Sequence, residues 1–90
     1  MDFSGYVESF LLKLRIDDFF DTTDYTKIRE ILLDKVPEWK KSRSVPVEYF
    51  IEIIILIDQL AGGSRFFDEE TAIKVEDSCL EIEDILNNLI

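Results

Sequence analysis

The sequence contains no histidine and only one cysteine, and these absences remove most of the side chains on which enzyme sites depend. Without histidine, the chain lacks the commonest general base near neutral pH and every Ser-His or Cys-His nucleophile pair. Paired carboxylates could still act as acid and base, but a chain of 90 residues rarely encloses the cleft that shifts their pKa values. We therefore expect a protein that is not an enzyme and that holds no cofactor and no metal ion.

The single cysteine, Cys79, cannot form a disulfide within the chain, so the fold must depend on apolar packing and a reducing compartment fits best. Met1 is followed by neither the basic segment nor the small-residue cleavage site of a secretory signal. The longest apolar-rich stretch, residues 45–61, contains three acidic residues and is too short to span a bilayer. These features predict a cytoplasmic protein that does not cross a membrane.

Basic residues are half as numerous as acidic ones, 10 against 20, which leaves a net charge of −10. The charge is uneven: residues 1–24 carry −4, residues 25–43 carry +3, residues 44–67 carry −2 and residues 68–90 carry −7. Nucleic acids and anionic membranes attract basic surfaces, so we expect this chain to bind neither directly. A basic protein surface is the expected partner.

Apolar residues are plentiful, at 47% of the chain with seven Phe, three Tyr and one Trp. This composition lies well outside the low-hydrophobicity, high-charge range of disordered chains. Ninety residues leave no room for a second core, so residues 1–90 are predicted to form a single domain.

Two amphipathic helices are predicted in the first half of the chain from apolar residues that recur at helical spacing. The first covers residues 3–14, with Asp2 or Ser4 as its N-terminal cap, and the second covers residues 25–36, with Thr23 or Asp24 as its cap. Pro37 is expected to end the second helix. Residues 37–43 (PEWKKSR) are then a connector, from which Trp39 folds back onto the core.

Residues 45–61 are rich in isoleucine, which favours a strand by propensity. The segment is about three times the length of a typical strand, and Glu48, Glu52 and Gln59 align along one narrow stripe of a helix. We predict a nearly buried central helix that is capped by Ser44 and ended by Gly62 and Gly63.

The last predicted helix runs from Phe67 or Asp68 to Leu89. Its core-facing residues follow a 3, 4, 3, 4, 3 spacing at Ala72, Val75, Cys79, Ile82, Leu86 and Leu89. Short connections between helices favour antiparallel neighbours. The fold class that follows is all-α, an antiparallel bundle of about four helices.

The side of the last helix opposite its core-facing residues is the main candidate binding surface. Glu70, Asp77, Glu81 and Asp84 form an acidic row there. On one flank of this row, Ile73 and Leu80 lie between it and a second acidic row, formed by Glu69, Glu76 and Glu83. Two apolar side chains with a rim of carboxylates are typical of an interface centre with a polar rim. The alternative is an ordinary solvated face on which another helix covers Ile73 and Leu80.

A second candidate surface is the acidic segment formed by Asp17, Asp18, Asp21 and Asp24 around Phe19 and Phe20. The first three aspartates form the DDxxD pattern with which helical prenyl-transferring enzymes hold magnesium and a diphosphate. Those enzymes are several times longer and have a second acidic motif. We therefore favour a solvated helix end with both phenylalanines turned inward, and we keep Asp17, Asp18 and Asp21 as candidate contacts for a protein partner.

In size, charge and predicted helix number, the whole chain resembles the small helical immunity proteins that protect bacteria from nuclease bacteriocins and contact-dependent growth-inhibition toxins. Residues 24–37 (DYTKIREILLDKVP) are similar to the acidic second helix of colicin DNase immunity proteins. The DxxYYP signature of those proteins is absent, so no binding residue is carried over. The resemblance implies an inhibitor that blocks the basic substrate-binding surface of a cognate toxin, with carboxylates where the toxin expects phosphates.

Two alternatives remain. A nucleic-acid mimic, such as a phage or plasmid inhibitor of a host enzyme, would present long acidic rows with little apolar centre. A helical adaptor or structural subunit would instead leave the segment 45–61 partly exposed in the isolated monomer. For the isolated chain we expect a monomer or a weak dimer.

Overall fold

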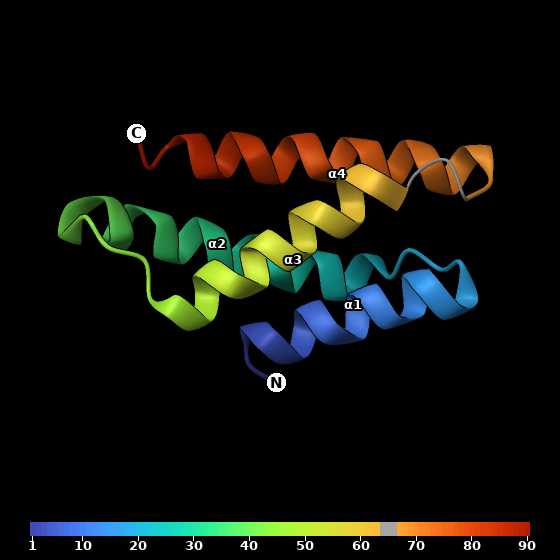
Figure 1. Ribbon diagram of the computed structural model, residues 1–90, viewed down its shortest axis with the longest axis horizontal. Helices are drawn as coiled ribbons and strands as arrows, with labels where there is room; N and C mark the ends of the chain where they lie inside the picture. Colours follow the sequence, from blue (N-terminus) through green and yellow to red (C-terminus); the bar gives the residue numbers. More distant parts are fainter. Residues whose placement is uncertain (64–66) are drawn as a thin grey trace.

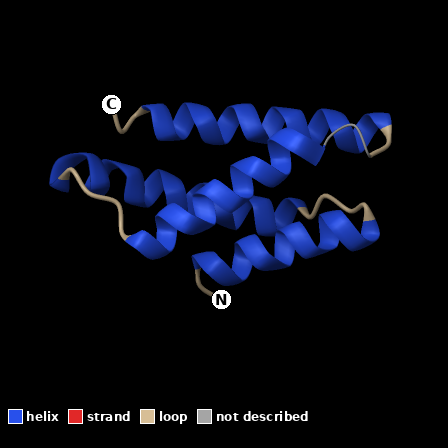
Figure 2. Cartoon of the chain, in the orientation of Figure 1, coloured by secondary structure: helices blue, strands red, loops and turns tan. Residues whose placement is uncertain are grey.

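The computed structural model describes residues 1–63 and 67–90, and the part of the chain that it describes contains four helices and no strand (Figure 1, Figure 2). The helices are α1 (Phe3–Asp17), α2 (Thr22–Ser42), α3 (Val47–Gly63) and α4 (Glu69–Asn87). The predicted all-α bundle is confirmed.

The four helices form two antiparallel hairpins, α1 with α2 and α3 with α4 (Figure 1). The hairpins pack on each other through α1 with α3 and through α2 with α4, so the order around the bundle is α1, α2, α4, α3. α3 crosses the molecule obliquely, from beside the N-terminal end of α1 to beside α4 (Figure 1). Each helix therefore has two neighbours and one side that faces away from the core.

One apolar core connects all four helices. Phe10 of α1, Ile28 of α2, Leu56 of α3 and Ile82 of α4 are completely covered. Burying a side chain of this size stabilises the fold by about 1.5–3 kcal/mol. The spacing that predicted α1 includes its buried residues Phe3, Val7, Phe10 and Leu14. In α4, three of the predicted core-facing residues are buried, namely Val75, Cys79 and Ile82.

An aspartate is the N-terminal cap of three helices, and the cap of α2 is not the predicted residue. Asp2 accepts from the Gly5 N–H at 2.8 Å and Asp68 accepts from the Thr71 N–H at 2.7 Å, which confirms these two starts. α2 is capped by Asp21, whose side chain accepts hydrogen bonds from the N–H groups of Thr23 and Asp24, so the prediction of Thr23 or Asp24 as the cap is wrong. The apolar pattern begins only at Tyr25, one turn after the backbone has become helical.

The prediction that α2 ends before Pro37 is also wrong, because the helix continues through the proline to Ser42. Proline removes one backbone donor and strains the preceding turn. The continuation carries Trp39 into the core as predicted, where its ring lies edge-on to Tyr49 with the ring centroids 5.1 Å apart. We attribute the unbroken helix to this burial of Trp39, a contact that the local sequence does not reveal.

α3 is a helix as predicted and ends at Gly63, but it is not nearly buried. Ile53, Leu56 and Leu60 face the core, whereas five apolar residues on the opposite side are 43–70% exposed: Val47, Phe50, Ile51, Ile54 and Ile55. Among the described residues, no helix lies over that side. Ser44 is not the cap of α3, because its N–H donates to the Trp39 carbonyl at the end of α2 and Pro46 directly precedes α3.

Candidate protein interface

The outer face of α4 lies opposite the residues that pack into the core, which are Val75, Ser78, Cys79, Ile82 and Ile85. At about 100° per residue, Ile73 and Leu80 fall on the outer side. They are 52% and 62% exposed. The alternative in which another helix covers these two side chains is therefore wrong, because both are exposed on the outer side of α4, two turns apart along the helix.

The predicted acidic residues around this pair are exposed: Glu69, Glu70, Glu76, Asp77, Glu81 and Asp84. Lys74 is the single basic residue of α4, and its Nζ lies 3.7 Å from Glu70 Oε1. Within residues 1–63 and 67–90, no basic side chain forms an ion pair with Asp77 or Asp84. The outer face of α4 is thus an apolar centre with a largely uncompensated negative rim.

Glu81 has a second role that the sequence did not reveal. The Tyr25 hydroxyl of α2 donates to Glu81 Oε1, and Arg29 Nη1 lies 3.9 Å from Glu81 Oε2. Burial, followed by the bond to Glu81, raises the pKa of Tyr25 above its ordinary value, so the hydroxyl stays protonated as a donor. Glu81 therefore ties α4 to α2, whereas the side chains of Asp77 and Asp84 in the same acidic row have no hydrogen-bond or ion-pair partner among the described residues.

A hollow of about 340 Å³ adjoins Leu80 on the side of α3 and is lined by Leu60, Ala61, Glu76, Cys79 and Leu80. The Cys79 thiol donates to Glu83 Oε1 at 3.5 Å. Burial, together with the Glu83 carboxylate, raises the pKa of Cys79, which keeps the thiol protonated and unreactive. Cys79 is a packing residue, and the hollow extends the apolar surface around Leu80.

The aspartates of the α1–α2 connection do not form one site. Asp18 ends α1 in a left-handed conformation with φ 50°, and Asp17 is exposed beside it. Asp21 caps α2 and accepts from Lys13 Nζ at 2.5 Å, while the buried Asp24 accepts from Lys13 and Ser9 at 3.1 and 2.7 Å. In the part of the chain that the structure describes, no three acidic side chains converge as metal ligands would. Asp21 thus belongs to the α1–α2 contact rather than to a binding surface.

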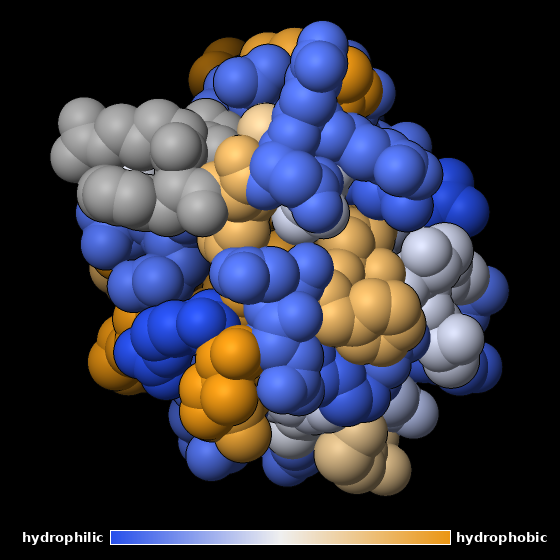
Figure 3. Space-filling model, turned by 90° about the vertical axis from the view of Figure 1, so that its right-hand side faces the viewer, coloured by the Kyte–Doolittle hydropathy of each residue, from blue (hydrophilic) through white to orange (hydrophobic). Residues whose placement is uncertain are grey.

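The two phenylalanines of this connection point in different directions. Phe20 packs on Phe10 and Tyr25, with ring centroids 5.1 and 5.4 Å apart, so its predicted inward position is confirmed. Phe19 is exposed, and its predicted inward position is wrong. The end of the molecule that carries this connection is mainly hydrophilic, with hydrophobic side chains at intervals rather than in one patch (Figure 3). It is a weaker candidate interface than α4.

The ion pair between Lys13 and Asp21 predicts a specific dependence of stability on pH. The bond from Lys13, helped by backbone N–H donors, lowers the pKa of Asp21, and the Thr71 N–H lowers that of Asp68. A carboxyl group whose pKa is lower in the folded state stabilises the fold above its unfolded pKa, and this stabilisation is lost as the pH falls through the folded value. The free energy of unfolding should therefore decrease below about pH 4.

Asp21→Asn tests this dependence, because asparagine retains a side-chain oxygen for the cap but cannot ionise. The variant should lose part of the decrease in unfolding free energy between about pH 5 and pH 3, measured by urea unfolding at each pH, and Asp68 should account for part of what remains. Asp17→Asn, at the exposed end of α1, is the matched control. Equal pH slopes for wild type and Asp21→Asn would contradict the role of the Lys13–Asp21 pair.

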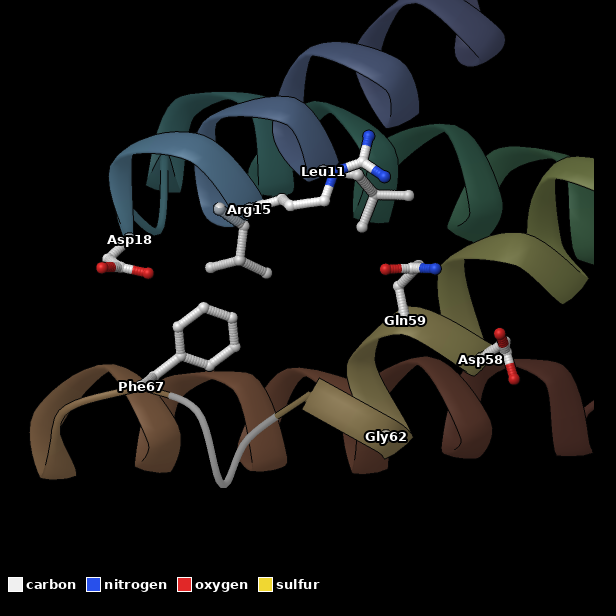
Figure 4. Close-up of a pocket in the computed structure, with 8 residues that line it drawn as sticks. Leu11, Arg15, Asp18, Asp58, Gln59, Gly62 and Phe67 are labelled. Carbon is white, nitrogen blue, oxygen red and sulfur yellow. The ribbon is translucent and has the colours of Figure 1, made fainter.

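A groove of about 480 Å³ between α1 and the C-terminal end of α3 was not predicted, because its walls are about forty residues apart in the sequence (Figure 4). Its lining includes Leu11, Leu14, Arg15, Asp18, Asp58, Gln59, Gly62 and Phe67. The Phe67 ring points toward α1, and the polar side chains come from separate walls (Figure 4). The polar groups do not converge on one point, so we assign no ligand to this groove.

None of the helices in the described residues is long and apolar enough to cross a membrane. Comparison of the chain with models of protein families, with curated proteins and with solved structures found no match.

Proposed function

We propose that this protein is an inhibitor of the immunity-protein type, which binds a basic protein partner, such as a nuclease toxin, through the outer face of α4. The observation that supports this most directly is the exposure of Ile73 and Leu80, at 52% and 62%, between two rows of carboxylates. Apolar side chains with a rim of carboxylates on both sides are typical of an interface centre with a polar rim, so their position favours an interface.

Each part of this face has a role in binding. The apolar pair and the adjoining hollow provide area that is removed from water on association. The carboxylates speed encounter with a basic surface and discriminate against acidic or neutral ones. Residues 68–90 carry a net charge of −7, and the mutual repulsion of these charges would be relieved by a basic partner. A surface that normally binds phosphates has the required charge.

A nucleic-acid mimic is a less suitable interpretation, because a phosphate backbone has no counterpart of the exposed Ile73 and Leu80 pair. The helical adaptor or structural subunit gains support from a different observation, the exposed apolar side of α3. A role as adaptor or structural subunit is compatible with a role as inhibitor, since α3 and α4 can contact different molecules.

Growth rescue tests the proposal. Co-expression of the chain with the product of the adjacent reading frame, as the candidate toxin, is expected to restore growth of bacteria that this product inhibits. Asp77→Lys with Asp84→Lys should abolish the rescue and raise the Kd of the complex by roughly 100-fold or more, because charge reversals within an interface cost several kcal/mol. Glu81 is left intact, because it holds Tyr25.

The matched control is Asp34→Lys with Glu38→Lys, which makes the same change of charge at exposed positions of α2. This control should retain rescue. Leu80→Ser should weaken binding without changing the charge. Failure of wild type to rescue, or rescue that survives both Asp77→Lys with Asp84→Lys and Leu80→Ser, would overturn the proposal.

A further inference from the structure

The exposed side of α3 is an apolar part of the described surface that the proposed function does not use. Its five residues, Val47, Phe50, Ile51, Ile54 and Ile55, are here called the α3 face, and each is 43–70% exposed. Together they present on the order of 500 Å² of apolar surface, a size at which a patch on a single chain is often functional. Four of the five residues are β-branched and lie exposed along two turns of the helix. This arrangement favours burial of the α3 face against another molecule.

The residues of the α3 face form one continuous stripe opposite Ile53, Leu56 and Leu60. Glu48 and Glu52 lie at one edge of the stripe, and Glu52 accepts from the Ser4 hydroxyl of α1 at 3.0 Å. Asp58 is the one charged residue within the stripe, near its C-terminal end. The centre of the stripe has no charge that would select a basic partner, in contrast to α4.

We propose that a second copy of this chain covers the α3 face, with the two α3 helices antiparallel around a two-fold axis that passes between Ile51 and Ile54. Such an interface is self-complementary, because each residue pair occurs twice. Ile51 would face the second copy's Ile54, and Phe50 would face its Ile55. Apolar side chains thus meet apolar side chains over the whole centre.

The charges at the two ends of the α3 face favour this direction. In the same register, Asp58 of each copy lies opposite Val47, at the start of the other α3, where Glu48 is the acidic residue of the first turn and lies at the edge of the stripe. Pro46 precedes that start and has no side chain to accept from the backbone N–H groups of the first turn, which carry the positive end of the helix dipole. Arg43 adds a positive charge three residues earlier. A parallel pairing would instead place the two Asp58 carboxylates together.

The area is sufficient for a dimer but not for an obligate one. A standard interface buries about 800 Å² on each partner, whereas the α3 face offers on the order of 500 Å², or about 1,000 Å² for the pair, which is the size of weak and transient interfaces. Because each copy carries a net charge of −10, long-range repulsion opposes association at low salt. We therefore expect a dimer that forms at micromolar to millimolar concentration and that strengthens as salt increases.

Light scattering after size-exclusion chromatography measures the oligomeric state of the intact chain. Between about 1 µM and 1 mM, the mass should rise from 10.6 kDa toward twice that value. Ile54→Lys, at the centre of the face, should remain a monomer throughout, and Ile51→Lys serves as a second variant. Leu80→Lys makes a comparable change on α4 and should still form the dimer.

Cysteine cross-linking tests the direction of the pairing in a Cys79→Ala background. A mixture of Val47→Cys and Asp58→Cys chains should yield the mixed disulfide dimer, whereas either variant alone should cross-link poorly. A protein that stays at 10.6 kDa at all concentrations, a dimer that persists in both Ile54→Lys and Ile51→Lys, or preferential linkage of Val47→Cys to itself would overturn the proposal.

This inference goes beyond the proposed function, and the two fail separately. Ile54→Lys should abolish the dimer and leave growth rescue intact, whereas Asp77→Lys with Asp84→Lys should abolish rescue and leave the dimer. Loss of rescue in Ile54→Lys would mean that the α3 face binds the toxin instead of a second copy, and would overturn the dimer proposal.

Discussion

Replacing Phe10 with alanine is expected to destabilise the protein by about 3–5 kcal/mol, the largest effect of any single truncation that we predict. Phe10 is completely buried at the contact between α1 and α2, and its ring packs against Phe20 and Tyr25 with centroids 5.1 and 6.0 Å apart. The substitution removes apolar burial and two aromatic contacts and leaves a cavity. A chain of 90 residues is stable by roughly 5–13 kcal/mol in total, so the loss is a large fraction.

Urea unfolding followed by circular dichroism measures this loss. Leu12→Ala is the control on the same helix, because Leu12 is 46% exposed and its truncation should change the free energy of unfolding by less than about 0.5 kcal/mol. A midpoint for Phe10→Ala close to that of wild type would show that Phe10 is not at the centre of the core.

The second large effect is a contrast between two neighbouring positions of α3. Leu56 is completely buried, whereas Ile54, two residues earlier, is 51% exposed. Leu56→Ala should destabilise the monomer by about 2–5 kcal/mol, and Ile54→Ala by less than about 1 kcal/mol. Both are large apolar residues in the same helix, so the difference isolates the orientation of α3 from its composition.

This comparison requires low protein concentration, about 1 µM, so that the dimer proposed above does not contribute to the stability of wild type. For each variant, thermal unfolding and urea unfolding should give the same change in the free energy of unfolding. Equal destabilisation by Leu56→Ala and Ile54→Ala would contradict the orientation of α3 and would mean that both of its faces are covered within the monomer.

Local signals predicted most of the secondary structure. The helical spacing of Phe3, Val7, Phe10 and Leu14 predicted both α1 and its buried side, and Asp2, which caps it, was one of the two predicted caps. These signals act within one or two turns, so they can be read without knowledge of the fold. The same holds for the core-facing side of α4, although Ser78 and Ile85, which are also buried, were not included.

The errors occurred where a distant contact decided the outcome. Pro37 normally ends a helix, but α2 continues because Trp39 is buried against Tyr49 of α3. Asp21 was a candidate contact for a partner until the structure placed Lys13 of α1 beside it. In both cases the local sequence was consistent with the predicted arrangement and with the observed one.

The candidate interface on α4 was predictable in composition but not in exposure. The alternation of Ile73 and Leu80 with carboxylates is visible in the sequence, whereas the absence of a covering helix depends on the order of helices around the bundle. Glu81 was grouped with Asp77 and Asp84 because all three share one side of α4. Its bond to Tyr25 follows from the packing of α2 beside that side.

By itself, the sequence determined the four helices, the negative charge and the lack of histidine chemistry, because helical periodicity and composition do not depend on distant contacts. Only the tertiary structure decided which side of α3 is buried. Large apolar residues occupy both sides of this helix, so its own pattern does not distinguish Leu56 from Ile54. The choice depends on the positions of α1 and α4, which cover one side of α3 and leave the other exposed.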